Sequence, residues 1–507
     1  MRAFDRGGPL EREFFCPAFD TCLKSEHVKT QKRGILKTAV AALALSLLGG
    51  RTALYAQSPP QRPVGEVIDQ YVRDALKSNL SLRADSLEVE RNLAALDEAR
   101  AKFLPTVSFD ARYTRTQGGR EIDVPLGTLV NPIYSTLNQL LAAQGRPAQF
   151  GTIQNQTILF QREREQDTRF TVRQALYAPA IPAAVRAQKA QLESSQFNHV
   201  AVARRLKRDM TVAYLDWLKS TRSVEIVRAS VELLNENVRV NESLNTNGKT
   251  TRDQVLRARA EQLAVEQQLR DALNQQAQAR SYVNFLRNHP LDEPLDAAEV
   301  DAELGHAAHD LAQLRAAALR DRPEIGQLDS AITAAESQVQ VARAGWKPTL
   351  SLGVDAGIQD EQYDFGRGRN FGTVSLLLHW QFFDGGATRA QASSARAEAR
   401  RAAVRRDEVT QQIQLEVQQA LDQLQTSADS IATARARSEA AQAAFRIASR
   451  KRDEGVINQV EFIDSRSSLT GAQLNLNVTR FDLLARQAEL DYATAAGTVP
   501  LDITGEQ

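Results

Sequence analysis

The chain has 507 residues, and its 63 basic and 62 acidic side chains give a formal net charge of +1. This balance argues against a nucleic-acid-binding protein, which normally carries a strong basic excess. Aromatic residues make up only 6% of the chain, and its two cysteines are Cys16 and Cys22. The composition therefore favours long helices over compact globules, and it leaves no cysteine beyond residue 22 for a disulfide or a metal site.

The N-terminal segment has the pattern of an export signal. Basic residues between Lys29 and Lys37 precede the apolar run 38–48, and small residues follow as far as Ala56. A basic flank, a short apolar core and a small residue at the cut are typical of a secretory signal peptide. The core has about half of the ~20 residues that a membrane-spanning helix needs. We predict that residues 1–56 are a leader, so that the mature chain has no cysteine.

Residues in the two halves of the chain match at constant spacings. The segment 103–108 aligns with 346–351, 243 residues later, and Gly248 aligns with Gly455, 207 residues later. The sequence therefore predicts a duplicated helix–strand–strand–helix–helix unit. Between the halves, residues 291–310 hold seven acidic and no basic side chains, and we interpret them as a solvated linker. The predicted segments are a leader, a first repeat, the acidic linker, a second repeat and a tail, at 1–56, 57–290, 291–310, 311–497 and 498–507.

Strands are indicated where apolar and polar residues alternate over about ten positions. The pattern covers four segments, 106–115, 168–177, 349–359 and 372–383. Such segments fit transmembrane strands with lipid on one side and water on the other, and they fit an ordinary half-buried sheet equally well. Because the smallest known transmembrane barrels need about eight strands, four strands can span a membrane only if several chains share one barrel.

Long helices are indicated by heptads. Apolar and small residues recur at alternating spacings of four and three from Leu206 to Val238, and the same phase returns from Ile413 to Phe445. This periodicity is typical of left-handed coiled-coil packing. A helix from Ile181 to Gly248 would be about 100 Å long at 1.5 Å per residue, several times a normal globular helix.

Taken in order, these features resemble the TolC family of outer-membrane efflux ducts. The resemblance rests on the two units, the Pro-Thr-x-Ser openings at 105–108 and 348–351, the Phe-Phe-Asp-Gly-Gly at 382–386, and the helix turns at 247–250 and 454–458. It covers about residues 66–497, and one departure is the segment 178–182, which stands where the second half has Asp-Gly-Gly.

The resemblance implies a mainly α fold with a transmembrane β part. Three chains would form a homotrimer, in which four strands per chain make a 12-stranded β-barrel continuous with an α-barrel tunnel. The protein would lie in the cell outer membrane with a long periplasmic extension, as a passive duct without a cofactor. Its partners would be a periplasmic adaptor (membrane fusion) protein and an inner-membrane pump, driven by protons or ATP. Residues 116–167 would form a long extracellular loop, partly over the pore.

The resemblance also places the periplasmic mouth at the two helix turns. The candidate gate and tip residues are Gly248, Asp253, Gln254, Arg452, Asp453, Glu454, Gly455, Ile457, Glu461 and Asp464. We hypothesise an Asp253–Arg452 ion pair in the closed state, with two separately solvated charges as the alternative. The acidic residues of the second turn would favour cations at the mouth, or else form a surface that faces the adaptor or the solvent.

Other chemistry has little support in the sequence. His306 and His309 beside Asp310 could bind a metal, but a stray pair in an acidic segment is more typical of solvated residues. Phosphate-loop and nucleophile-elbow patterns do not occur, so we expect no enzyme, no catalytic residue and no metal site. Small-molecule efflux and type I secretion both fit the expected export duct. The alternative is an exported periplasmic coiled-coil scaffold without a pore, whose strands form a small soluble sheet.

Overall fold

The computed structural model describes residues 62–160, 162–300, 310–362 and 368–499. The chain divides after Pro60 into two units, and the elements below all belong to the unit that starts at Gln61. The predicted leader at 1–56 and the His306/His309 pair lie outside the described residues, as does the tail from residue 500.

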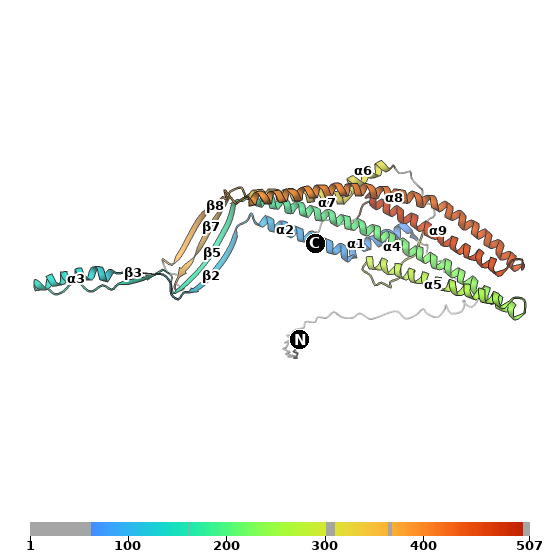
Figure 1. Cartoon of the computed structure of the whole chain (residues 1–507), viewed down its shortest axis with the longest axis horizontal. Helices are drawn as coiled ribbons and strands as arrows, with labels where there is room; N and C mark the ends of the chain where they lie inside the picture. The colour runs from blue at the N-terminus through green and yellow to red at the C-terminus, as the bar shows by residue number, and fades with distance from the viewer. Residues whose placement is uncertain (1–61, 161, 301–309, 363–367, 500–507) are drawn as a thin grey trace, which may run out of the picture. The chain divides into compact units, whose positions relative to one another are not determined.

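The two halves of the described chain repeat one order of elements (Figure 1). The first half contains α1 (Val64–Ser78), α2 (Leu80–Ala101), β2 (Thr106–Arg115), β5 (Arg164–Tyr177), α4 (Ala180–Thr246) and α5 (Arg252–Leu286). The second half contains α6 (Leu311–Asp321), α7 (Pro323–Ala344), β7 (Thr349–Asp360), β8 (Asn370–His379), α8 (Ala387–Asp453) and α9 (Gln459–Ala493). Both α4 and α8 have 67 residues, and both α5 and α9 have 35. The predicted duplication is confirmed.

The long helices follow the predicted heptads. All ten heptad positions of α4 from Leu206 to Val238 are buried, where α4 packs against α2, α5, α7 and α9. The equivalent positions of α8 are buried through Leu424, but most of those from Ser427 to Phe445 are only half-buried. A seam that is covered in α4 is therefore partly open in α8.

The first part of the acidic linker is packed rather than solvated. The Tyr214 hydroxyl donates to the backbone carbonyl of Asp296 at 2.7 Å, and the Asp296 N–H donates to the Tyr71 hydroxyl at 2.9 Å. Leu295 and Val300 pack on the apolar cluster formed by α1, α4 and α5. In addition, β6 (Ala298–Glu299) pairs in parallel with β1 (Arg62–Pro63). Residues 295–300 are therefore packed against the first half of the chain.

The strands form one antiparallel sheet in the order β2-β5-β7-β8. Its register places Val107, Val172, Val354 and Val374 in one row across all four strands. The last strand is shorter than predicted, because β8 ends at His379 and not at residue 383. Beyond it, the Asp384 carboxylate accepts hydrogen bonds from the N–H groups of Gly386 and Thr388 and starts α8. The apolar residues Trp380, Phe382 and Phe383 thus lie in the irregular segment between β8 and α8.

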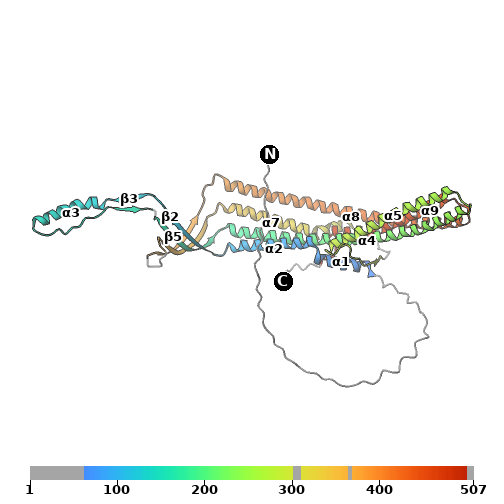
Figure 2. The same ribbon diagram turned by 90° about the horizontal axis from the view of Figure 1, so that it is seen from below.

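The segment predicted as a loop at 116–167 contains regular structure. It holds β3 (Glu121–Val124), the helix α3 (Leu126–Ala143) and β4 (Gln156–Leu159), with β3 and β4 paired (Figure 2). This excursion leaves β2 and returns to β5 at the sheet end remote from α2 and α4. The β2–β5 connection is therefore an extended hairpin that carries its own helix.

Candidate functional site

The sheet carries its apolar side chains on an uncovered face. Val107 is 68% exposed and Val374 is 72% exposed, although both belong to the apolar row. On the opposite face the Asp167 carboxylate, only 6% exposed, accepts a hydrogen bond from Arg169 Nε at 2.8 Å. Thr171 donates to Asp355 at 2.6 Å on the same face. This polarity is the reverse of a sheet in water, and it suits strands whose outer face meets lipid.

Both long hairpins end in the same kind of turn. Gly248 follows α4 with φ of 69° and Gly455 follows α8 with φ of 73°, a left-handed conformation that glycine adopts without steric cost. The N–H groups after them, of Lys249 and Val456, donate to carbonyls five residues earlier, both at 2.8 Å. These bonds satisfy orphan carbonyls at the helix ends. The turns predicted from the paired glycines are therefore built alike.

The charged gate candidates have separate partners in this structure. Arg452 Cζ lies 4.1 Å from the centroid of the Phe462 ring, and its Nε lies 3.8 Å from the Asp453 carboxylate. Asp253 lies 4.0 Å from Arg257 in the other hairpin. The hypothesised Asp253–Arg452 pair is therefore not formed within the described chain, and it stays a prediction for the closed state of an assembly.

The remaining tip candidates divide by exposure. Gln254 and Ile457 are half-buried, whereas the carboxylates of the second turn are exposed: Asp453, Glu454, Glu461 and Asp464. The Glu461 N–H donates to the Asn458 side chain at 2.9 Å, which caps the start of α9. The turn thus presents its acidic side chains to the surroundings, and the helix-capping bond is made by a neutral amide.

Buried polar side chains join α4 to α9 behind this turn. Gln459 Nε2 donates to the Asn237 side-chain oxygen at 2.5 Å, and the Ser230 and Thr470 hydroxyls lie 3.3 Å apart. Arg466 Nε donates to the Ser230 hydroxyl at 3.3 Å, and burial lowers the pKa of this guanidinium. We call these residues, with Asn241, the polar seam. The sequence did not predict the polar seam, because heptads are evident in α4 and α8 but were not assigned in α9.

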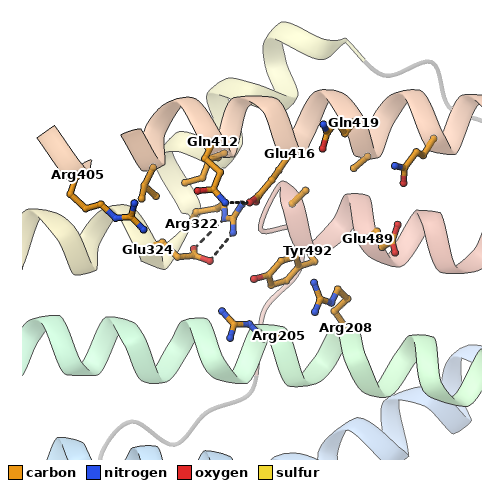
Figure 3. A pocket seen from close by; sticks show the side chains of 15 residues that line it. Arg205, Arg208, Arg322, Glu324, Arg405, Gln412, Glu416, Gln419, Glu489 and Tyr492 are labelled. Carbon is orange, nitrogen blue, oxygen red and sulfur yellow. Dashed lines mark hydrogen bonds and ion pairs between the residues drawn. The ribbon is translucent and has the colours of Figure 1, made fainter. Parts of the chain in front are cut away.

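A second buried charge lies where α6 meets α7. Arg322, whose side chain is 6% exposed, donates to Glu324 at 2.7 Å and to Glu416 of α8 at 2.5 Å (Figure 3). Its guanidinium carbon also lies 5.3 Å from the centroid of the Tyr492 ring. These groups line a cavity of about 550 Å³ between α4, α7, α8 and α9.

The ion pairs set the protonation of this junction. Burial alone would raise the pKa of Glu324, but hydrogen bonds from Arg322 outweigh it and the pKa is lowered. Burial would likewise lower the pKa of Arg322, whereas the Glu324 and Glu416 carboxylates raise it. Both groups are therefore held in their charged forms, and the cavity wall is a structural ion-pair network.

Neither a metal cluster nor an apolar spanning helix is found in the described residues. No group of three or more His, Cys, Asp or Glu there is arranged to hold a metal ion. His289 does lie near Asp74 and Glu293, but Arg287 contacts the same two carboxylates at 2.7 and 3.7 Å. Among the described helices, none combines the length and hydrophobicity needed to cross a membrane.

Comparison with known proteins decides the family. The chain matches the family model for outer membrane efflux proteins over residues 71–286 and 314–496, which is most of its length. The chain belongs to the outer membrane efflux protein family. No curated protein matches it by sequence.

Solved structures of outer-membrane channels share the fold. The CmeC outer membrane channel of Campylobacter jejuni has a TM-score of 0.71 at 16% identity, over 85% of this chain and 86% of that chain. VceC from Vibrio cholerae and the open state of MtrE from Neisseria gonorrhoeae both have a TM-score of 0.67 at 18% identity. Each of these two comparisons covers 85% of this chain, with 96% of the VceC chain and 89% of the MtrE chain.

Family membership confirms the predicted resemblance and the predicted class of function. This outer membrane efflux protein is an outer-membrane duct for transport, and the alternative of a scaffold without a pore is not supported. The duplicated, mainly helical fold with a four-stranded sheet is also confirmed. The roles of the ten tip residues remain predictions, because the comparisons identify the fold and family and not the gate.

Proposed function

We propose that three copies of the chain form a closed duct through the outer membrane. The uncovered apolar face of the sheet carries this proposal, and its edges support it: within the described residues, β2 and β8 each pair with a strand on one side only. Open sheet edges do not occur in lipid, where every backbone N–H and C=O needs a partner. Three sheets joined edge to edge would give about 12 strands, enough to close a barrel around a polar interior.

The helices would continue this barrel as a periplasmic tunnel. α4 and α8, at 67 residues each, would extend about 100 Å. The half-buried heptad positions of α8 from Ser427 to Phe445 supply a surface for a neighbouring copy. In this arrangement the tunnel wall is made by coiled-coil contacts both within and between subunits.

The helix turns at Gly248 and Gly455 would form the periplasmic mouth. Exposed carboxylates around the second turn would give the mouth a field that favours cations, or a surface that an adaptor protein recognises. An inner-membrane pump would supply the energy, and the duct itself would be passive. Small-molecule efflux and type I secretion both fit this role, because the pump selects the cargo.

Single-channel conductance in a planar bilayer tests the proposal. We expect discrete conductance steps from the purified trimer, and a larger or longer-lived open state for Asp253→Ala and Arg452→Ala. Arg259→Ala serves as the matched control, because Arg259 pairs with Glu242 at 3.0 Å within the first hairpin. A protein without conductance would contradict the duct. Normal conductance that neither tip variant changes would contradict the gate residues alone.

The segment boundaries are also part of the proposal. We infer a leader at 1–56, repeats at 57–290 and 311–497, and a linker at 291–310. N-terminal sequencing of the protein from outer membranes tests the leader, with Gln57 as the expected first residue. A start well beyond Pro63 would contradict it, because the whole of β1 would then be lost.

A further inference from the structure

The helix α3 is held to its return segment by a ladder of asparagines. The Asn131 side chain donates to the Ile153 carbonyl and accepts from the Ile153 N–H, both at 2.8 Å. Seven residues later, Asn138 makes the same pair of bonds with Phe150, at 2.7 and 3.1 Å. Two asparagines one heptad apart thus bond the backbone N–H and C=O groups of the return segment, as a neighbouring strand would. They hold one face of α3 against its own chain.

The opposite face of α3 is apolar and uncovered. Leu129, Ile133 and Leu140 are 64%, 58% and 57% exposed. At about 100° per residue these positions lie across the helix from Asn131 and Asn138. Leu126, Ile133 and Leu140 are spaced by seven, and Leu129 falls between them at a spacing of three and four. This is the spacing of a coiled-coil seam.

The chemistry of the hairpin favours another protein surface over lipid. α3 contains no Asp, Glu, Lys or Arg, and no Trp. Helices that lie in a membrane interface typically carry Lys or Arg on their polar face and aromatic anchors on the other. The polar face of α3 carries amides instead, and these are already used by the ladder. A neutral, heptad-spaced face fits best against an identical neutral face.

The position of the hairpin identifies this partner as a second copy of the chain. The hairpin continues directly from β2, an edge strand of the sheet, and from β5 beside it. In the proposed trimer each β2 edge meets a neighbouring subunit, so three hairpins would rise around one axis at the same end of the barrel. Sheet closure and helix association would then occur between the same three chains.

We propose that the α3 helices of three subunits pack through Leu129, Ile133 and Leu140 into a three-helix cap at the outer end of the duct. This inference rests on the proposed trimer. The cap encloses the apolar stripe that each chain leaves uncovered, and it places a neutral helical cover over the exit.

Cysteine cross-linking tests the cap in the whole protein. Both native cysteines, Cys16 and Cys22, precede residue 57, so an introduced cysteine is unique in the processed chain. Ile133→Cys lies in the centre of the apolar stripe. Ser135→Cys is the matched control, because it is exposed on the ladder side of the same helix, beside Asn131. Native mass spectrometry in detergent measures the trimer independently of any cross-link.

The outcomes separate the cap from the duct. We expect mild oxidation to convert most Ile133→Cys protein into covalent dimers on a denaturing gel, many-fold more than for Ser135→Cys. A trimer in which the two variants cross-link equally little would overturn the cap and leave the duct intact. Absence of the trimer itself would overturn the proposed function. Quenching by spin-labelled lipid of a fluorophore attached to the Ile133→Cys variant would overturn the cap in favour of a lipid-facing helix.

Discussion

Single buried side chains fix the places where the helices of each repeat change direction. In the second repeat, Arg322 lies between α6 and α7 and donates hydrogen bonds to Glu324 of α7 and to Glu416 of α8. The equivalent position of the first repeat is Asn79, whose amide donates to the Leu286 carbonyl at 2.9 Å and accepts from the Leu82 N–H. At this position, one repeat therefore uses a neutral amide and the other an ion pair.

Acid should weaken the junction at Arg322. The pKa of Glu324 is lowered on folding from its ordinary value of 4.5. A carboxyl with a lowered folded pKa stabilises the fold above its unfolded pKa, and this contribution is lost as pH falls through the folded value. We expect the melting temperature of the wild type to fall as pH drops below about 4.5, and that of Glu324→Gln to be lower at neutral pH but less sensitive to acid. Parallel pH profiles for the two proteins would show that Glu324 is not the titrating group.

Residue types with special roles were only partly predictable from sequence. The glycine turns at 248 and 455 were predicted, because the two glycines match in the repeats and a left-handed turn after a long helix favours glycine. Arg322 was not, because an arginine beside a proline and a glutamate looks like an ordinary helix start. Its burial depends on Glu416, nearly a hundred residues away, and no local pattern reports that contact.

At the scale of elements, the left-handed turns of the two long helical hairpins limit which residues can replace their glycines. Gly455→Ala places a side chain at φ of 73°, which costs about 1–2 kcal/mol for a residue other than glycine. Gly471→Ala is the matched control, because it lies within α9 and a Cβ there meets no atom within 4 Å. We expect thermal denaturation to show a lower melting temperature for Gly455→Ala and an unchanged or higher one for Gly471→Ala. Equal melting temperatures would mean that the turn relaxes without cost.

The polar seam predicts coupling between α4 and α9. Asn237→Leu or Gln459→Leu alone leaves a buried amide without its partner, which costs about 1–3 kcal/mol. The double variant removes both polar groups, and we expect it to recover part of that loss. A double-mutant cycle in thermal denaturation measures this coupling, and additive effects would show that the two amides act independently.

Elements were predicted best where one pattern extends over many turns. The helix predicted from Ile181 to Gly248 matches α4 closely, and its heptad positions are all buried, whereas the heptads of α8 predicted only the central half of that helix. The helix α3 was missed because its polar face is amide-rich, Pro132 lies inside it, and no acidic or basic residue marks its ends. The end of β8 was predicted four residues too late, because Trp380 and Phe382 continue the alternation of apolar and polar residues. Trp380 lies beyond the strand, and its ring N–H donates to the Trp346 carbonyl.

At the scale of the whole molecule, the fold leaves surfaces that a single chain cannot bury. The apolar row of the sheet, the partly open seam of α8 and the apolar stripe of α3 lie on separate elements, and association of copies would cover the last two. Sequence patterns predicted the row and the heptads. They could not predict which faces stay open within one subunit, because that depends on which helices pack on which.

The orientation of the sheet gives the sharpest test at this scale. Val374 of β8 faces outward and is 72% exposed, while the adjacent Ser375 is on the polar face opposite Gly353. An arginine that faces lipid near the bilayer midplane costs about 2–4 kcal/mol, whereas the same charge on the polar, lumen side is tolerated. We therefore expect Val374→Arg to reduce the amount of assembled protein recovered from outer membranes several-fold, and Ser375→Arg to leave it near the wild-type level. Equal recovery of both variants would mean that the valine row does not meet lipid. Something other than lipid would then have to cover the apolar face of the sheet.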